Sequence, residues 1–271
     1  MSVINTNIGA LKAANASASA NKALGSAMER LSTGKRINSA KDDAAGLAIA
    51  TSMTSQVRGM NQSIRNANDG ISMAQTAEGA LQEVTNMLQR VRELAVQSAS
   101  GTYSDGDRAN LQTEVAALTG QIGDVLADTK FNGVALFDGS AGTAGAVSIQ
   151  VGANSGETVT LSFAAITDAT TATTVATQTD ANTAIGTVDT FLATVNTRRA
   201  ELGAGQSRLE SAVNNLTNNV TNLSDARSRI EDADYTSETT ALAKAQILSQ
   251  ASTAMLSQAN QSQQNVLSLL R

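Results

Sequence analysis

Three short acidic groups are the residues whose types and spacing come closest to an active or metal-binding site. Asp42 and Asp43 are adjacent carboxylates, while Asp105–Asp107 and Asp232–Asp234 each hold two aspartates around one small residue. A calcium site needs about six to eight oxygens at fixed offsets, and neither of the latter stretches supplies them. Acidic residues also start helices, because they accept hydrogen bonds from exposed backbone N–H groups. We therefore predict caps and turns here, with no catalytic, cofactor-binding or metal-binding residue.

The chain lacks the side chains on which most active sites depend. Its 271 residues include no His, Cys, Trp or Pro. Without His there is no side chain that ordinarily titrates near neutral pH, and the commonest metal ligand is missing. Without Cys there is no thiolate or disulfide. Gly203-Ala-Gly205 lies inside a heptad pattern rather than after a strand, so it is no dinucleotide fingerprint. These features indicate a protein that is not an enzyme.

Charge and hydropathy exclude two further classes of partner. The net charge is −5, and Lys35-Arg36 is a basic pair too short to neutralise a nucleic-acid backbone. No apolar stretch reaches the ~18 residues that a membrane span needs. The first residues show no basic segment followed by an apolar one, as a cleaved signal peptide would. We expect no nucleic acid, no membrane insertion and, if the chain is secreted, a route without a cleaved signal.

Helical periodicity at both ends predicts the elements that carry the function. Apolar residues recur three or four apart, which is the spacing of one helix face. After Glu238 the only ionisable side chains are Lys244 and Arg271. A helix that is apolar or small on more than one face needs neighbours on several sides. The expected packing residues of the N-terminal helix are Ile4, Ile8, Leu11, Leu24, Met28 and Leu31. Those of the C-terminal helix are Leu248, Met255, Leu256, Val266, Leu267, Leu269 and Leu270.

Between the ends, the pattern predicts a mainly α fold: a long antiparallel coiled-coil-like helical bundle with a small β-hairpin region in the middle. Heptad spacing from Ile185 to Ile230 indicates a long helix. Alternating residues over 147–151 and 158–163 indicate the hairpin, and the Thr/Ala-rich run 167–184 reads as a surface loop. Along the chain the pattern gives helical ends 1–33 and 237–271, connectors 34–43 and 231–236, helical stretches 44–137 and 185–230, and the hairpin and surface region 138–184.

Several long stretches resemble those of the bacterial flagellins, in the same order and at both ends of the chain. Many flagellins carry a proline just before the last residues, where this sequence has Gln263 or Gln264. The resemblance covers roughly residues 1–165 and 180–271. The stretches that carry it are Ile4–Leu11, Leu31–Ile49, Leu88–Gln97, Phe131–Gly133, Ser228–Tyr235, Ala245–Leu248 and Gln264–Arg271.

This resemblance implies a structural subunit that self-assembles into the extracellular flagellar filament and serves motility. The terminal helices would form an inner core domain, the connectors its spokes, and the long helices an outer core domain with a short variable region. The implied partners are other flagellin subunits in a helical homopolymer, the flagellar type III export apparatus with an export chaperone, and the filament cap and hook-associated proteins. Export would be as an unfolded chain. The alternative is a hook–filament junction protein, whose termini are similar.

Three residues also match positions by which Toll-like innate receptors of a host recognise many flagellins. They are Arg90, Leu94 and Glu114. The competing interpretation places residues 88–97 on a core helix and its subunit contacts, and the sequence leaves both open.

Overall fold

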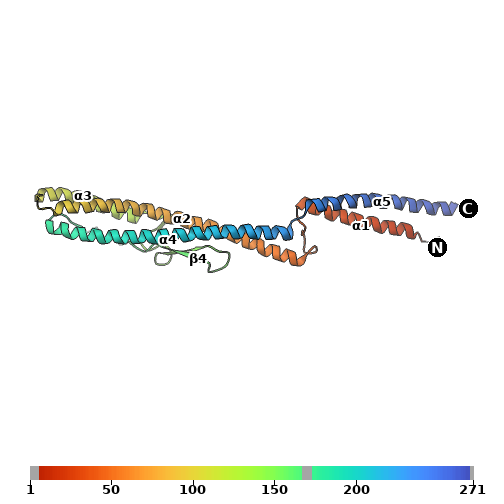
Figure 1. Ribbon diagram of the computed structural model, residues 1–271, viewed down its shortest axis with the longest axis horizontal. Helices are drawn as coiled ribbons and strands as arrows, with labels where there is room; N and C mark the ends of the chain where they lie inside the picture. The colour runs from red at the N-terminus through yellow and green to blue at the C-terminus, as the bar shows by residue number, and fades with distance from the viewer. Residues whose placement is uncertain (1–5, 167–172, 269–271) are drawn as a thin grey trace. The chain divides into compact units, whose positions relative to one another are not determined.

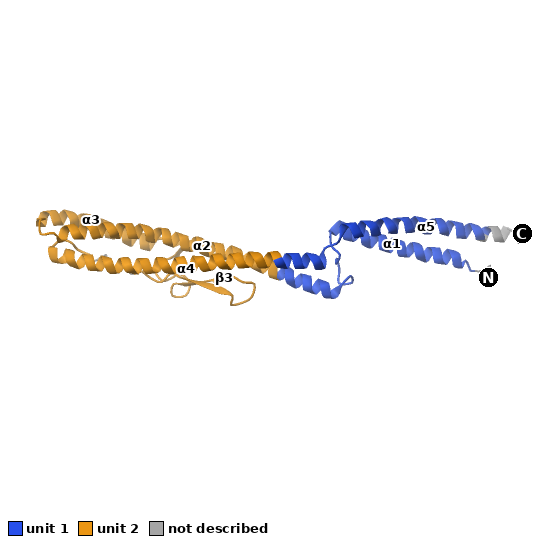
Figure 2. Cartoon of the chain, viewed as in Figure 1, with its two compact units in different colours: residues 1–55, 222–271 blue, residues 56–221 orange. Residues whose placement is uncertain are grey.

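The computed structural model describes residues 6–166 and 173–268, without the side chains of 263 and 265–268. Within these residues it contains five helices and two small antiparallel sheets, so the predicted mainly α fold with a β-hairpin in the middle is confirmed (Figure 1). Two compact units divide the chain, as Figure 2 shows: residues 1–55 with 222–271 form unit 1, and residues 56–221 form unit 2. The connectors thus fall inside unit 1, and the expected division at the connectors stays a prediction.

Unit 1 is built around two antiparallel helices, α1 (Ile8–Thr33) and α5 (Tyr235–Ser268) (Figure 1). The side chain of Asn7 caps the start of α1 by accepting a hydrogen bond from the N–H of Ala10. The helix ends at Gly34, whose φ of 71° lies in the left-handed region that favours glycine. The predicted terminal helices are therefore present, although the first residues lie outside the described part.

Small residues line the contact between α1 and α5. On α1 the buried residues are Ala13, Ala20 and Ala27, which lie seven apart. On α5 the buried residues are Ala245 and Ser252, also seven apart. A seven-residue repeat keeps one face of each helix toward its partner. Because these side chains are small, the helix backbones pack closely and little of each helix surface is used.

Polar contacts fix the antiparallel register of this pair. The Asn7 side-chain amide donates to the carbonyl of Ala259 at 3.0 Å, and Arg30 forms an ion pair with Glu238 at 3.0 Å. Between them, the Ser249 hydroxyl donates to the Asn21 side-chain oxygen at 2.9 Å. The contacts are spread over most of the length of α1, so the two helices form one hairpin-like pair, called here the terminal pair.

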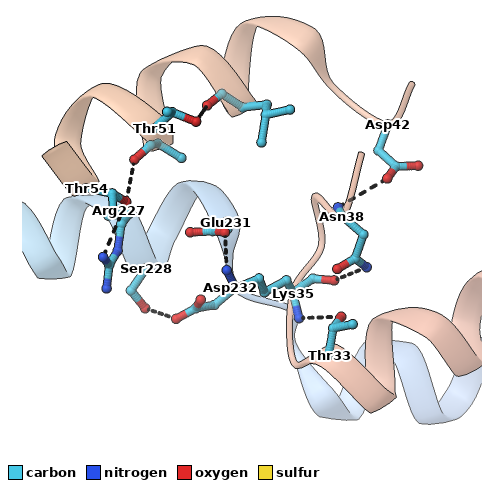
Figure 3. A network of polar contacts seen from close by, with 12 residues as sticks. Thr33, Lys35, Asn38, Asp42, Thr51, Thr54, Arg227, Ser228, Glu231 and Asp232 are labelled. Carbon is cyan, nitrogen blue, oxygen red and sulfur yellow. Dashed lines mark hydrogen bonds and ion pairs between the residues drawn. The ribbon is translucent and has the colours of Figure 1, made fainter. Parts of the chain in front are cut away.

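The connectors are joined to one another by short backbone and side-chain contacts (Figure 3). Lys35 and Asp232 form an isolated antiparallel β-bridge, and the Lys35 ammonium pairs with Glu231 at 2.5 Å. The N–H of Ala233 donates to the Gly34 carbonyl at 2.9 Å. The helix break on the C-terminal side covers only residues 232–234, which is shorter than the expected 231–236. These bonds tie the end of α1 to the start of α5.

Unit 2 is a bundle of three helices: parts of α2 (Ala44–Ala99) and α4 (Gln178–Glu231), with α3 (Asp105–Asp128). At ~1.5 Å per residue, the 56 residues of α2 span about 84 Å. A capping box between Ser104 and Asp107 starts α3. The core is formed mainly by aliphatic residues from all three helices, together with phenylalanines and residues of the strands and loops. Its largest fully buried members include Leu81, Leu88, Ile122, Leu202 and Leu209.

Two small sheets accompany the bundle. The predicted hairpin is confirmed as β3 (Ala146–Gln150) paired with β4 (Thr158–Ser162), and the alternation along β4 buries Val159 and Leu161. A second, unpredicted hairpin joins β1 (Lys130–Phe131) to β2 (Val134–Ala135). Its turn residues Asn132 and Gly133 have φ values of 49° and 82°. The Asn-Gly pair is a strong sequence signal for such a turn, so this hairpin could have been found.

One prediction about the middle of the chain was wrong. Helix α4 begins at Gln178, not near 185, so part of the expected surface loop 167–184 is helical. The Thr177 hydroxyl accepts a hydrogen bond from the N–H of Asp180 at 3.1 Å, as a helix cap does. Ala181 and Ala184 are buried against the bundle. Residues 167–172 of that loop lie outside the described part.

Candidate assembly surface

The adjacent carboxylates at the start of α2 have structural roles. The Asp43 carboxylate accepts a hydrogen bond from the N–H of Gly46 at 2.8 Å and caps the helix. Asp42 accepts hydrogen bonds from the N–H groups of Asn38 and Ser39, at 3.2 and 2.9 Å. The hydrogen bond from the backbone of Ser39 is the main reason why the pKa of Asp42 is lowered. Both residues therefore hold a turn and a helix start.

The other two acidic stretches are also local structure. The Asp107 carboxylate accepts a hydrogen bond from the Ser104 hydroxyl, which lowers the pKa of Asp107. Asp232 accepts from the Ser228 hydroxyl at 2.6 Å, and Asp234 accepts from the N–H of Thr236 at 2.9 Å. Across residues 6–166 and 173–268, no cluster of three or more acidic, His or Cys side chains is placed to hold a metal ion. Nor is any described helix long and apolar enough to cross a membrane.

The terminal pair exposes large apolar side chains on α1. Ile8, Leu11 and Met28 are each more than half exposed, whereas Leu24 and Leu31 are half-buried. All five belong to the predicted packing set of the N-terminal helix, and its sixth member, Ile4, lies outside the described residues.

Helix α5 shows the same feature more strongly. Met255 is 67% exposed, and Leu248 is also exposed, while Leu256 is half-buried. Ile247, which the predicted set omits, is 66% exposed. Four further predicted residues have no described side chain, either within α5 or beyond its end: Val266, Leu267, Leu269 and Leu270.

The exposure of these residues follows from the number of helices in each unit. In unit 2 three helices and a hairpin surround the apolar faces, and residues such as Leu88 and Leu209 are fully buried. In the terminal pair each helix has one neighbour, and that contact is taken by alanines. The large aliphatic side chains consequently face outward. Large apolar residues exposed on a helix that is almost uncharged, as α5 is, are typical of a protein–protein interaction surface.

The proposed receptor-recognition residues are not presented together. Arg90 pairs with Glu114 at 2.9 Å and with Glu93 at 3.1 Å on the outer side of the bundle. The hydrogen bond to Glu114 is the main reason why the pKa of Arg90 is raised. Leu94 is only 1% exposed and belongs to the core. A partner binding this folded unit would therefore meet Arg90 and Glu114, but not the side chain of Leu94.

Two family models match most of the chain. One is described as the bacterial flagellin N-terminal helical region and matches residues 4–142. The other is described as the bacterial flagellin C-terminal helical region and matches residues 185–270. The unmatched residues between them include the hairpin β3–β4 and the start of α4.

Relatives with similar sequences differ in how much of their length the chain spans. A flagellin of Xenorhabdus nematophila is 45% identical over 314 aligned positions, which cover 100% of this chain and 99% of that protein. The B-type flagellin of Pseudomonas aeruginosa is 54% identical over 160 residues, covering 59% of this chain. The alignment spans only 32% of that longer protein.

Solved structures agree with this assignment. The crystal structure of Bacillus cereus flagellin is 33% identical, with a TM-score of 0.52 over 60% of this chain and 94% of that one. A putative flagellar hook-associated protein from Vibrio parahaemolyticus gives a TM-score of 0.60 over 70% of this chain and 100% of its own. At 15% identity, the latter shows a shared fold alone. Two family models, a relative matched over its whole length and a solved structure thus agree: the chain belongs to the bacterial flagellins, which are structural proteins of the flagellar filament and not enzymes.

Proposed function

We propose that the exposed apolar residues of α1 and α5 are the surface through which this chain joins copies of itself in a flagellar filament. The observation that carries the proposal is the contrast within the terminal pair. Its inner contact is made by buried alanines such as Ala20, whereas Leu11, Ile247 and Met255 point away from it. Several large apolar residues exposed on one helix pair are typical of a surface that another molecule covers.

The free energy available from covering these residues is sufficient to drive association. Full burial of one Leu, Ile or Met side chain contributes about 1.5–3 kcal/mol, and six such side chains on the terminal pair are close to half exposed or more. In the sequence after Glu238, Lys244 and Arg271 are the only ionisable side chains. Docking therefore removes few charges from water, which would otherwise cost several kcal/mol each.

The geometry of the contact determines the kind of assembly. In a heterologous contact, different surfaces of two copies meet. Repeating such a contact gives a closed ring only if the rotation between copies closes, and otherwise it gives an open helical fibre. In this proposal residues 1–33 and 237–271 form the inner core, and 34–43 and 231–236 act as spokes. Residues 44–137 with 185–230 form the outer core, joined by the helical residues 178–184 whose Ala181 and Ala184 are buried in the bundle. The remaining residues 138–177 of the predicted region 138–184 form the outer surface region.

The family membership supports further partners. We infer export of the unfolded chain, without a cleaved signal, through the flagellar type III apparatus with an export chaperone, and then contact with the filament cap and hook-associated proteins. In a host, Arg90 and Glu114 are the accessible members of the set that would meet a Toll-like receptor. A junction protein between hook and filament is the second candidate, and its support is the fold shared with a putative hook-associated protein.

Seeded elongation tests the proposal and separates these two candidates. The full chain is added to sheared filament fragments, and fragment length is followed by electron microscopy. A filament subunit lengthens the fragments continuously, whereas a junction protein leaves their length almost unchanged. Leu11→Glu should abolish lengthening, because it places a charge among the exposed apolar residues of α1. Ser140→Glu, on an exposed loop of unit 2, is the control and should lengthen normally. Normal elongation by Leu11→Glu would refute the role given to this surface.

A further inference from the structure

The turn of the hairpin β1–β2 holds the only Asn-Gly pair in the sequence, Asn132 and Gly133. Both residues are exposed, and their φ values of 49° and 82° are positive. In the part of the chain that the structure describes, neither the side-chain amide of Asn132 nor the backbone N–H of Gly133 forms a hydrogen bond. A Cβ added at Gly133 would meet no atom within 4 Å, so the space beside the turn is open.

These two unpaired groups are the reactants of asparagine deamidation. After losing its proton to water or hydroxide, the Gly133 nitrogen attacks the side-chain carbonyl carbon of Asn132. The new C–N bond closes a five-membered succinimide ring, and the side-chain nitrogen leaves as ammonia. Water then opens the ring at either carbonyl and gives aspartate or isoaspartate. One water is consumed and one ammonia released, with no oxidation or reduction. Because glycine has no Cβ, it neither crowds the attacking nitrogen nor resists the backbone rotation that the attack needs.

We propose that Asn132 is a site of spontaneous deamidation in the folded chain, with water as the only co-reactant. This inference goes beyond the assembly function and does not depend on it. Each event replaces a neutral amide by a carboxylate, so the net charge changes from −5 to −6. The isoaspartate product also adds one carbon atom to the main chain of a two-residue turn, where loop length determines the turn type and the strand register.

The other described asparagines lack this combination of groups. Most lie within helices, where the N–H of the following residue donates to a backbone carbonyl one turn earlier. Three others lie outside helices, and none of them precedes a glycine. The side-chain amides of Asn7 and Asn38 donate to backbone carbonyls at 3.0 and 3.1 Å. That of Asn154 donates to the Glu157 carboxylate at 2.9 Å. These bonds hold the three amides in place.

The hairpin is anchored at its base and not at its tip. The N–H of Leu136 donates to the carbonyl of Thr129 at 3.1 Å, and the side chains of Leu136 and Phe137 are buried. Only two residue pairs connect β1 and β2 beyond this base. The rotation that brings the Gly133 nitrogen to the Asn132 side chain therefore involves exposed residues alone. The reaction does not require unit 2 to unfold.

The test is incubation of the purified full chain in water enriched in oxygen-18, at pH 9 and at pH 6, followed by mass spectrometry of its peptides. The internal control is Asn154, which is also exposed on a loop but has a bonded amide. We expect Asn132 to convert at least about tenfold faster than Asn154, and faster at pH 9 than at pH 6. The product should carry oxygen-18 and include both aspartate and isoaspartate, and isoelectric focusing should show one new acidic band.

Asn132→Gln is the matched variant, because the same attack on the longer side chain would have to close a six-membered ring, which forms far more slowly. We expect this variant to lose the acidic band. Equal conversion of Asn132 and Asn154 in the unmodified chain would overturn the proposal, whether or not the variant folds normally. A product that contains aspartate without isoaspartate would also overturn it, because direct hydrolysis of the amide gives aspartate alone.

Discussion

The substitution Met255→Glu separates the stability of the monomer from its ability to assemble. Met255 is 67% exposed on α5, so a change there removes little packing from the folded chain. Glu and Met have similar helix propensities. Surface substitutions of this kind change the free energy of unfolding by about 0.5 kcal/mol or less. The monomer of this variant should therefore unfold at almost the same temperature as the unmodified chain.

Assembly should respond very differently. Covering Met255 contributes about 1.5–3 kcal/mol, and this is lost when Glu replaces it. Placing an unpaired carboxylate in the contact adds a penalty of several kcal/mol. A combined loss of at least ~3 kcal/mol corresponds to more than about a hundredfold in an equilibrium constant, since 1.4 kcal/mol is tenfold. The concentration of monomer that coexists with filaments should rise by at least that factor.

Sedimentation after seeded elongation measures this coexisting monomer concentration. Met255→Leu is the matched control, because Leu and Met are similar in volume and such exchanges usually cost less than about 1.5 kcal/mol. A Met255→Glu chain whose coexisting monomer concentration stays within threefold of the unmodified value would refute the reasoning.

Three further predictions concern unit 2. Leu94→Ala should lower the free energy of unfolding by about 2–5 kcal/mol in a denaturant titration, because it leaves a cavity in the core. Ser104→Ala removes the cap of α3 and should lower the free energy of unfolding by about 0.5–2 kcal/mol, seen as a lower melting temperature. Thr113→Ala in the same helix is its control, and an equal loss of stability in that variant would contradict the capping role of Ser104. Hydrogen bonding to Arg92 lowers the pKa of Asp189 in the folded chain. The ionised Asp189 therefore stabilises the folded chain above the unfolded pKa of about 4, and this contribution is lost as the pH falls through the lower pKa of the folded state. Stability measured from pH 6 to pH 2 should therefore fall less steeply in Asp189→Asn, and an unchanged slope would contradict this.

The long helices were predictable because their patterns are long and regular. From Val188 to Leu216 the buried residues of α4 recur at steps of three, four or seven, as heptad spacing requires. Gly34 and Asp43 marked a helix end and a helix start through the chemistry of capping, which depends on nearby residues only. Features fixed by local sequence or by a long repeat were therefore predictable.

Features fixed by tertiary contacts were harder to predict. The start of α4 was misplaced because Ala181 and Ala184 give no hydrophobic pattern, although the bundle buries them. The predicted helix at the N-terminal end was correct, but the sequence did not show that alanines would form its inner contact and leave Leu11 outside. Leu94 was grouped with Arg90 by sequence, and only the packing of the bundle shows that its side chain is covered. Which face a partner helix takes is not encoded in the periodicity of one helix.

Chemical labelling of α5 in the monomer and in the filament tests the central claim most directly. The chain contains no cysteine, so Ile247→Cys introduces a single thiol on the exposed face of α5, and Ser140→Cys introduces one on the outer loop. Alkylation rates are compared between the monomer and filaments of each variant. We predict that the thiol at position 247 reacts at least about tenfold more slowly in the filament, while the thiol at position 140 reacts equally in both states. A thiol at position 247 that reacts as fast in filaments as in monomers would contradict the account.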